Sequence, residues 1–280
     1  MKTPMTMSLL CSTGGFTRST VPEGYRAIAT YGPQLKVDGF EVLFYEPWTD
    51  YLDDVLAALR ATGFRFPALH AEKSIGTALG TGAPADRHAA LERLALNCAF
   101  AHSLGARVAV LHLWGLPESD THYHHNLAAL PDCLDVAAAH GVTLAIETIL
   151  CAAADPLTRV REALERDARC RVTLDTEFLA HFGQLSAALE ADWLWHGDIV
   201  RHVHIKDYDG RMTTEHGRRR FLQPGEGKID FAAFFAGLRR RGYGGSLSLE
   251  SSAFGPEFAV EIERTQRGLA ALRALLATAR

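Results

Sequence analysis

The hydrophobic positions follow a repeating order along the chain: a short apolar run rich in β-branched residues, a polar loop, and then a stretch with helical spacing. This order is typical of β-strands that each lead into an amphipathic helix. Eight such units can be counted. Their strands are expected at Ser8–Ser12, Phe40–Tyr45, Pro67–His70, Val108–His112, Thr143–Glu147, Val172–Asp175, Val200–Ile205 and Ser246–Glu250.

Helical spacing is clear in several of the intervening stretches. Apolar residues recur three and four positions apart over Tyr51–Arg60, Arg87–Leu104 and Leu127–His140, and a final helix is expected over Glu257–Ala279. Glycine stands where many of these helices should end, just before the next strand, as the left-handed cap of a helix requires. These glycines are Gly63, Gly105, Gly141 and Gly242.

Eight apolar strands, each followed by a helix, indicate a parallel sheet covered by helices, and eight strands are enough to close a barrel. An open doubly wound sheet is the alternative, but its GxGxxG phosphate fingerprint is missing after the first strand. Neither a linker nor a low-complexity segment divides the 280 residues. We therefore predict an α/β protein with a single (β/α)8 TIM barrel domain over residues 1–280.

Composition narrows the range of partners. Hydrophobic residues make up 48% of the chain and charged residues 22%, which is ordinary for a globular protein. The net charge of -4 gives no general attraction for nucleic acid or for anionic membranes. No apolar segment is long enough for a signal sequence or a membrane span, and the five cysteines lack disulfide-like spacing. We expect a cytoplasmic protein that binds a small molecule, with homo-oligomerisation left open.

Polar residues end six of the eight predicted strands. In a barrel of this kind the active site is built at the carboxyl ends of the strands. Carboxylates gathered there need partners or a metal ion to offset their burial, and a divalent cation would do so. The strand-end residues are His70, His112, Glu147, Asp175, His204 and Glu250.

Four of these residues come from consecutive units, the fifth to the eighth. Three carboxylates and an imidazole suit manganese, cobalt, magnesium or zinc, and they leave coordination positions open for water or substrate. A single polar residue at the end of a strand often faces solvent and has no further role, but this explanation fits polar residues at the ends of four consecutive strands poorly. The predicted ligands of one divalent metal ion are Glu147, Asp175, His204 and Glu250.

The remaining histidines have other expected roles. His202 shares the strand face of His204 and lies deeper, so we expect it to support the site from within the core. His70 and His112 could hold a second metal ion, but contact with the substrate is favoured. The predicted substrate-binding residues are His70, His112, Trp114, Lys206 and Arg211.

A long loop follows the seventh strand and carries the basic run Arg218–Arg220. Such a run is more typical of a solvated loop face than of a phosphate clamp, although the loop could close over a ligand. Asp230, at the end of the loop, is placed to cap the next helix.

The order of these motifs resembles the xylose isomerase-like barrel superfamily, in particular its sugar-phosphate isomerase and epimerase branch. The resemblance covers nearly the whole chain. It implies that the four strand-end residues ligate the metal and that Glu147 and Glu250 also act as catalytic acid and base. The matching pieces are Leu144–Thr148, Thr173–Thr176, His202–Asp207, Pro224–Gly227 and Ser248–Glu250.

Three positions depart from relatives in this superfamily. Phe178 stands where the family often has a histidine three residues after the strand-six aspartate, so the usual hydrogen bond to substrate hydroxyls does not carry over. Arg219 and Phe221 match the Asp-x-His pair of endonuclease IV relatives, so a three-zinc DNA repair site is not expected.

The predicted activity is that of a metal-dependent isomerase or epimerase of a small ketose, keto-polyol or sugar phosphate. The metal ion would stabilise an enediolate while Glu147 and Glu250, on opposite faces of the sugar, remove and return the proton. Loss of a β-hydroxyl from the same enolate would instead dehydrate an inosose-like substrate. The sequence leaves these outcomes open, together with non-catalytic sugar binding and, less favoured, an endonuclease IV-like DNA repair nuclease.

Overall fold

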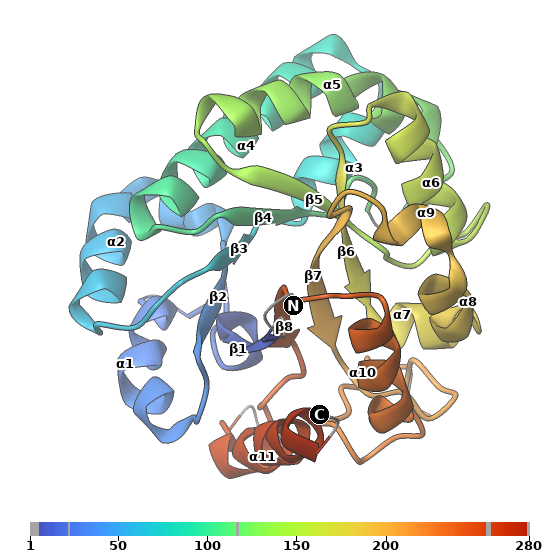
Figure 1. The fold of residues 1–280 in the computed structure, drawn as a ribbon. Coiled ribbons are helices and arrows are strands. Elements are labelled where there is room, and N and C mark those ends of the chain that lie inside the picture. Colours follow the sequence, from blue (N-terminus) through green and yellow to red (C-terminus); the bar gives the residue numbers. More distant parts are fainter. Residues whose placement is uncertain (1–5, 22, 116–117, 256–258, 279–280) are drawn as a thin grey trace.

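The computed structural model describes residues 6–21, 23–115, 118–255 and 259–278. Across these residues, eight parallel strands form a closed barrel in chain order, and the last strand pairs with the first (Figure 1). The predicted barrel is confirmed. The strands are β1 Ser8–Ser12, β2 Gly39–Leu43, β3 Ala68–His70, β4 Val108–Leu111, β5 Thr143–Glu147, β6 Arg171–Asp175, β7 Val200–Ile205 and β8 Ser246–Leu249.

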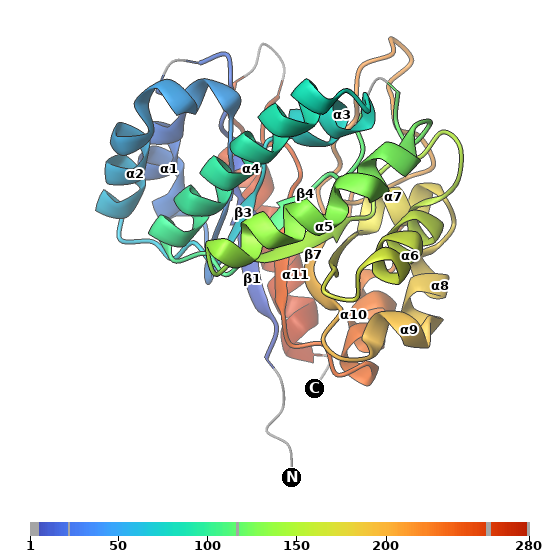
Figure 2. The same cartoon turned by 90° about the horizontal axis from the view of Figure 1, so that it is seen from above.

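Helices surround the barrel, and α4 and α5 lie side by side across one flank (Figure 2). No helix among the described residues is both long and apolar enough to cross a membrane. The helices are α1 Ala27–Tyr31, α2 Leu52–Ala61, α3 Ser74–Gly80, α4 Pro84–Leu104, α5 Tyr123–Ala139, α6 Pro156–Arg166, α7 Thr176–His181, α8 Leu185–Glu190, α9 Asp192–Trp195, α10 Phe231–Arg240 and α11 Ile262–Thr278. Short 3-10 turns occupy Thr13–Gly15, Gly24–Arg26, Gly32–Gln34 and Glu46–Tyr51.

Helix boundaries follow the capping signals in the sequence. Gly105 ends α4 with a φ of 81°, a conformation that residues with a Cβ rarely adopt. Asp230 caps α10 as expected, because its side chain accepts a hydrogen bond from the backbone N–H of Ala233 at 2.9 Å.

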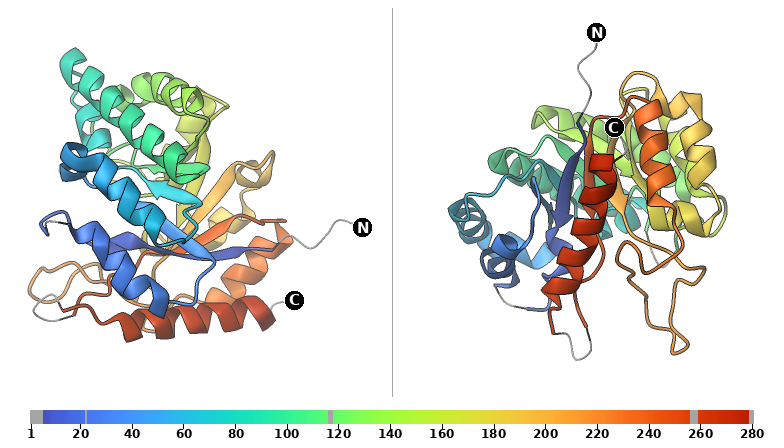
Figure 3. Two further views of the ribbon diagram at one scale, coloured as in Figure 1. Left: turned by 90° about the vertical axis from the view of Figure 1, so that its left-hand side faces the viewer. Right: turned by 60° about the horizontal axis from the view of Figure 1, so that its bottom comes forward.

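The last helix, α11, completes the outer layer beside α10 (Figure 3). Arg273 on α11 donates a hydrogen bond to the carbonyl of Lys36 at 3.0 Å, which ties the helix to the segment before β2. The helix begins later than the expected Glu257–Ala279, because Val260 pairs with Phe254 in an isolated antiparallel bridge. Residues 257 and 279 themselves lie outside the described residues.

The two faces of the strands differ in chemistry. The outward faces carry apolar side chains that pack under the helices, such as Val42, Ile146 and Leu249. The inward face carries buried polar side chains, and Glu41 on β2 reaches His202 and His204 on β7 across the interior. The main apolar core therefore lies between sheet and helices, whereas the interior combines polar groups with a few apolar side chains such as Leu10 and Val110. The fully buried polar residues of the inward face are Ser12, Glu41, His70, Glu147, Thr173, Asp175, His202, His204 and Ser248.

Candidate active site

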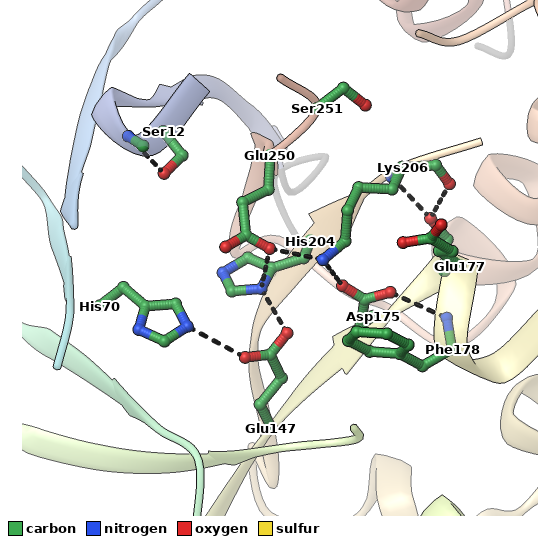
Figure 4. Close-up of polar contacts among 12 residues, drawn as sticks. Ser12, His70, Glu147, Asp175, Glu177, Phe178, His204, Lys206, Glu250 and Ser251 are labelled. Carbon is green, nitrogen blue, oxygen red and sulfur yellow. Dashed lines mark hydrogen bonds and ion pairs between the residues drawn. The ribbon is translucent and has the colours of Figure 1, made fainter. Parts of the chain in front are cut away.

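The four predicted ligands meet at the carboxyl-terminal mouth of the barrel (Figure 4). Glu147 and Asp175 end β5 and β6, His204 lies near the end of β7, and Glu250 directly follows β8. One ligand atom from each lies within 4.8 Å of the other three. Only 7% of the Glu250 side chain is exposed, and the other three side chains are fully buried.

His204 stands at the centre of this cluster, with each ring nitrogen facing carboxylates. Its Nδ1 lies 2.8 Å from Glu147 Oε1 and 3.3 Å from Glu250 Oε2, and its Nε2 lies 2.9 Å from Glu41 Oε1. Burial acts to lower the pKa of His204, but Glu41, Glu147 and Glu250 together raise this pKa well above its usual value. The imidazole of His204 therefore links three carboxylates, from β2, from β5 and from the position after β8.

Glu41 belongs to the site, although the sequence analysis did not identify it. It lies within the apolar stretch of β2 between Phe40 and Val42, and its Oε2 lies 3.3 Å from His202 Nε2. Burial favours the neutral acid, yet the two imidazoles hold the pKa of Glu41 well below its usual value. The sequence feature that could have identified Glu41 is that it is the only charged residue in a strand whose other residues are apolar. His202 lies deeper in the barrel, as expected from its position.

Lys206 extends from the end of β7 into the same cluster. Its Nζ lies 2.7 Å from Asp175 Oδ2 and 2.7 Å from Glu250 Oε2. Burial raises the pKa of Asp175 to about 7 although Lys206 opposes the shift. Burial acts the same way on Glu250, but there Lys206 and His204 prevail and lower the pKa to about 2. Glu250 is thus ionised at neutral pH, and the carboxyl of Asp175 is a weaker acid than that of Glu250.

His70 and His112 both face the second oxygen of Glu147. The distances from Glu147 Oε2 are 3.2 Å to His70 Nε2 and 2.7 Å to His112 Nε2. Burial lowers the pKa of His112 to about 4, so its ring is neutral at physiological pH. Burial also acts to raise the pKa of Glu147, but His204 and His112 hold this pKa well below its usual value.

A cavity of about 680 Å³ opens beside the cluster. Its wall comes mainly from the segments that follow β3, β4, β5 and β6, and it includes His112, Ile149 and Phe178. Lys73, also in the wall, lies 3.9 Å from Glu250 Oε1 and keeps 53% of its side chain exposed. The cavity gives a small molecule access to the edge of the carboxylate cluster, and Lys73 is a second residue that the sequence analysis missed.

The long loop after β7 folds back over this cavity. Arg219 lines the cavity and pairs through both terminal nitrogens with the buried carboxylate of Glu177 on α7, at 2.7 Å for Nη1 and Oε1. Arg220 pairs with Asp209 at 2.6 Å. Two of the three arginines in the basic run thus hold the loop in place, and Arg218 is exposed.

Two predicted substrate contacts lie away from the cavity. Trp114 is fully buried and donates its indole N–H to the carbonyl of Leu150 at 2.9 Å, so it supports the wall from behind. Arg211 is exposed in the loop after β7. The substrate roles of both residues stay predictions.

The arrangement fits a divalent cation. Within the described part of the chain, Glu41, Glu147, Asp175 and Glu250 bring four carboxylates together. In the same part, two buried positive groups face them: Lys206, beside Asp175 and Glu250, and the His204 imidazolium. Excess negative charge therefore remains in a region from which water is largely excluded. Oxygen and imidazole donors within 4.8 Å of one another match the preferences of manganese, magnesium, cobalt and zinc.

Comparison with known proteins agrees with the fold. The family model described as a xylose isomerase-like TIM barrel matches residues 23–275. No curated protein matches the chain in sequence.

Several solved structures superimpose over nearly the whole chain. A D-allulose 3-epimerase from Methylomonas sp. aligns with a TM-score of 0.74 and 19% identity, covering 98% of this chain and 100% of that one. A D-psicose 3-epimerase from Clostridium cellulolyticum H10 aligns with a TM-score of 0.69 and 16% identity, covering 96% of this chain and 99% of that one. A 3-keto-D-glucoside 4-epimerase from E. coli aligns with a TM-score of 0.69 and 20% identity, and the alignment also covers 96% of this chain and 99% of that one. At these identities the likeness shows a shared architecture.

Proposed function

Because the chain belongs to the xylose isomerase-like TIM barrel family, we propose that it is a divalent-metal-dependent isomerase or epimerase of a small ketose, keto-polyol or sugar phosphate. The observation that carries this proposal is the convergence of three carboxylates and one imidazole at the barrel mouth, within 4.8 Å. Structures of the same architecture include an epimerase of allulose and one of a keto-glucoside, which supports a carbohydrate substrate.

Glu147, Asp175, His204 and Glu250 are the residues that would hold the cation. His204 would use Nδ1, because this nitrogen faces Glu147 and Glu250 and the other nitrogen faces Glu41. When bound, the cation supplies Lewis acidity that polarises a carbonyl and makes the neighbouring C–H more acidic.

Glu250 is well suited to move a proton. Its Oε2 is occupied by Lys206, whereas its Oε1 has Lys73 as a distant neighbour at 3.9 Å. Because Glu250 is ionised at neutral pH and Lys206 is bound to its other oxygen, Oε1 is the atom that would accept a proton from a substrate carbon. Glu250 is therefore our candidate for the general base.

Glu147 is proposed as the second proton carrier. It ends β5, across the barrel mouth from Glu250, which follows β8. Its two oxygens face His204 and His112, and its side chain has no exposed surface. His112 lines the cavity and is neutral at physiological pH, so it can pass a proton between Glu147 and a substrate oxygen. His70 is fully buried and would act on the substrate through Glu147.

The test is proton exchange at carbon. Ketoses, inososes and their phosphates are incubated in heavy water with Mn²⁺ and the chelator-stripped protein, and deuterium uptake is followed by NMR. Exchange with inversion identifies an epimerase, and transfer to the adjacent carbon an isomerase. Tight binding with no exchange for any compound would replace the enzyme with a sugar-binding protein. Three bound ions by elemental analysis would instead favour a nuclease-type site.

A further inference from the structure

The ammonium of Lys206 lies within the carboxylate cluster, between Asp175 and Glu250 (Figure 4). Lys206 follows His204 by two positions, so both side chains point to the barrel interior. Only 7% of the Lys206 side chain is exposed. The lysine is therefore an internal cation of the site, in contact with two of the four residues that would hold the metal.

Lys206 uses the oxygens that a metal ion would need. Asp175 Oδ1 accepts the backbone N–H of Phe178 at 3.0 Å, which leaves Oδ2, and that oxygen is 2.7 Å from Lys206 Nζ. Glu250 Oε2 is likewise 2.7 Å from Nζ. A divalent ion on the same two oxygens would stand close to a positive ammonium in a buried region, where like charges repel strongly.

The ring of Phe178 gives the ammonium a place beside the carboxylates. Lys206 Nζ lies 4.6 Å from the centre of this ring, within the range of a cation–π contact. Phe178 also lines the cavity, so an ammonium that leaves Asp175 can remain over the ring and turn towards bound substrate. A lysine in that position could donate a hydrogen bond to a substrate oxygen.

We propose that Lys206 is a built-in counter-ion that competes with the divalent cation, so that metal binding displaces its ammonium from Asp175 and Glu250 towards the cavity. This inference rests on the proposed metal site. In the metal-free protein Lys206 offsets the charge of the two carboxylates and stabilises the fold. In the metal-bound protein the same ammonium becomes a substrate contact.

The test measures Mn²⁺ affinity by calorimetry on chelator-stripped protein. Lys206→Met removes the competing charge, and we expect Mn²⁺ to bind at least about tenfold more tightly than to the wild type. Lys206→Arg keeps the charge and should bind Mn²⁺ about as the wild type does. Lys36→Met is the matched control, because Lys36 is exposed in the segment before β2, at the amino-terminal end of the barrel; its affinity should change less than about threefold.

Thermal unfolding gives a second readout that does not depend on activity. Without metal, Lys206→Met should melt below the wild type, since two buried carboxylates lose their partner. Saturating Mn²⁺ should then raise the melting temperature of the variant by more than it raises that of the wild type. Lys206→Gln repeats the comparison if the methionine variant folds poorly.

The outcomes separate this inference from the proposed function. Equal or weaker Mn²⁺ binding by folded Lys206→Met and Lys206→Gln would overturn the competition while leaving the metal site intact. Absence of Mn²⁺ binding to the wild type and to every variant would overturn the metal site itself, and the competition with it.

Discussion

Glu41 Oε1 lies 2.9 Å from His204 Nε2, and neither side chain has any exposed surface. The contact joins β2 to β7 across the barrel interior. A carboxylate that accepts the Nε2–H of an imidazole orients the ring, so that Nδ1, once deprotonated, presents its lone pair to a cation. Glu41 thereby positions the one nitrogen donor of the proposed metal site without touching the substrate.

Substitution of Glu41 by Gln should weaken Mn²⁺ binding by about 10-fold to 100-fold, because the amide loses the charge that orients His204. Calorimetry on the stripped protein measures this change. Glu46→Gln is the control, since Glu46 is 64% exposed and pairs with Arg93 on the surface. If Glu41→Gln bound Mn²⁺ like the wild type while remaining folded, the positioning role would be wrong.

Glu147→Gln and Glu250→Gln should each reduce deuterium exchange into the substrate by at least about 100-fold. The amide retains an oxygen for the cation but cannot carry a proton, whether taken from carbon by Glu250 or passed through His112 by Glu147. Mn²⁺ binding is measured on the same samples, so that loss of a ligand is distinguished from loss of a proton carrier. Full exchange in either variant would remove that residue from the mechanism.

His112 gives a pH dependence whose sign follows from its lowered pKa. The ordinary pKa is 6.5 and burial lowers it to about 4 in the folded protein, so the unfolded chain binds the proton first. The stability due to the neutral ring is complete above pH 6.5 and is lost as the pH falls towards 4. His112→Gln, which can still donate a hydrogen bond to Glu147, should lack this loss.

Denaturant titrations in the presence of a chelator test this expectation. Between pH 7 and pH 4 the wild type should lose roughly 2–3 kcal/mol of unfolding free energy relative to His112→Gln. A difference between the two proteins that stays constant over this range would show that His112 titrates normally.

Arg219→Ala should lower the unfolding free energy by about 1–3 kcal/mol, because it leaves the buried carboxylate of Glu177 without its guanidinium partner. The exposed neighbour Arg218 provides the control, and Arg218→Ala should change stability by less than about 0.5 kcal/mol. Arg219 also lines the cavity, so its loss should raise KM as well. Equal stability of the two variants would mean that the ion pair contributes nothing.

Strand positions followed from the sequence to within two residues, because each apolar run ends at a polar residue or a turn. The start of α11 did not follow, since the bridge between Phe254 and Val260 depends on a contact that no local pattern encodes. The short helix α3 carries Gly76, whose added Cβ would come within 2.2 Å of the carbonyl of His112. Helix α3 packs closely here through a glycine, which has no side chain, so its sequence shows little of the hydrophobic periodicity that identifies a helix.

The strand-end residues of the site were predictable because the barrel topology brings the carboxyl ends together. Glu41 was not, because its partners His202 and His204 are more than 160 positions away in sequence and reach it only across the interior. The contacts of Lys206 with Asp175 and Glu250 could not be predicted for the same reason. The two carboxylates come from β6 and from the segment after β8, which are distant in sequence. The sequence alone suggested only a substrate contact for Lys206.

The carboxylate cluster is carried by strands, whereas the cavity wall comes mainly from the segments that connect strands to helices. Under the proposed function, the reacting groups and the groups that select the substrate therefore belong to separate parts of the molecule. Ile149 and Leu150, whose side chains are not part of the ionic cluster, are positions at which substitution should change which substrate is accepted while leaving the carboxylate cluster in place.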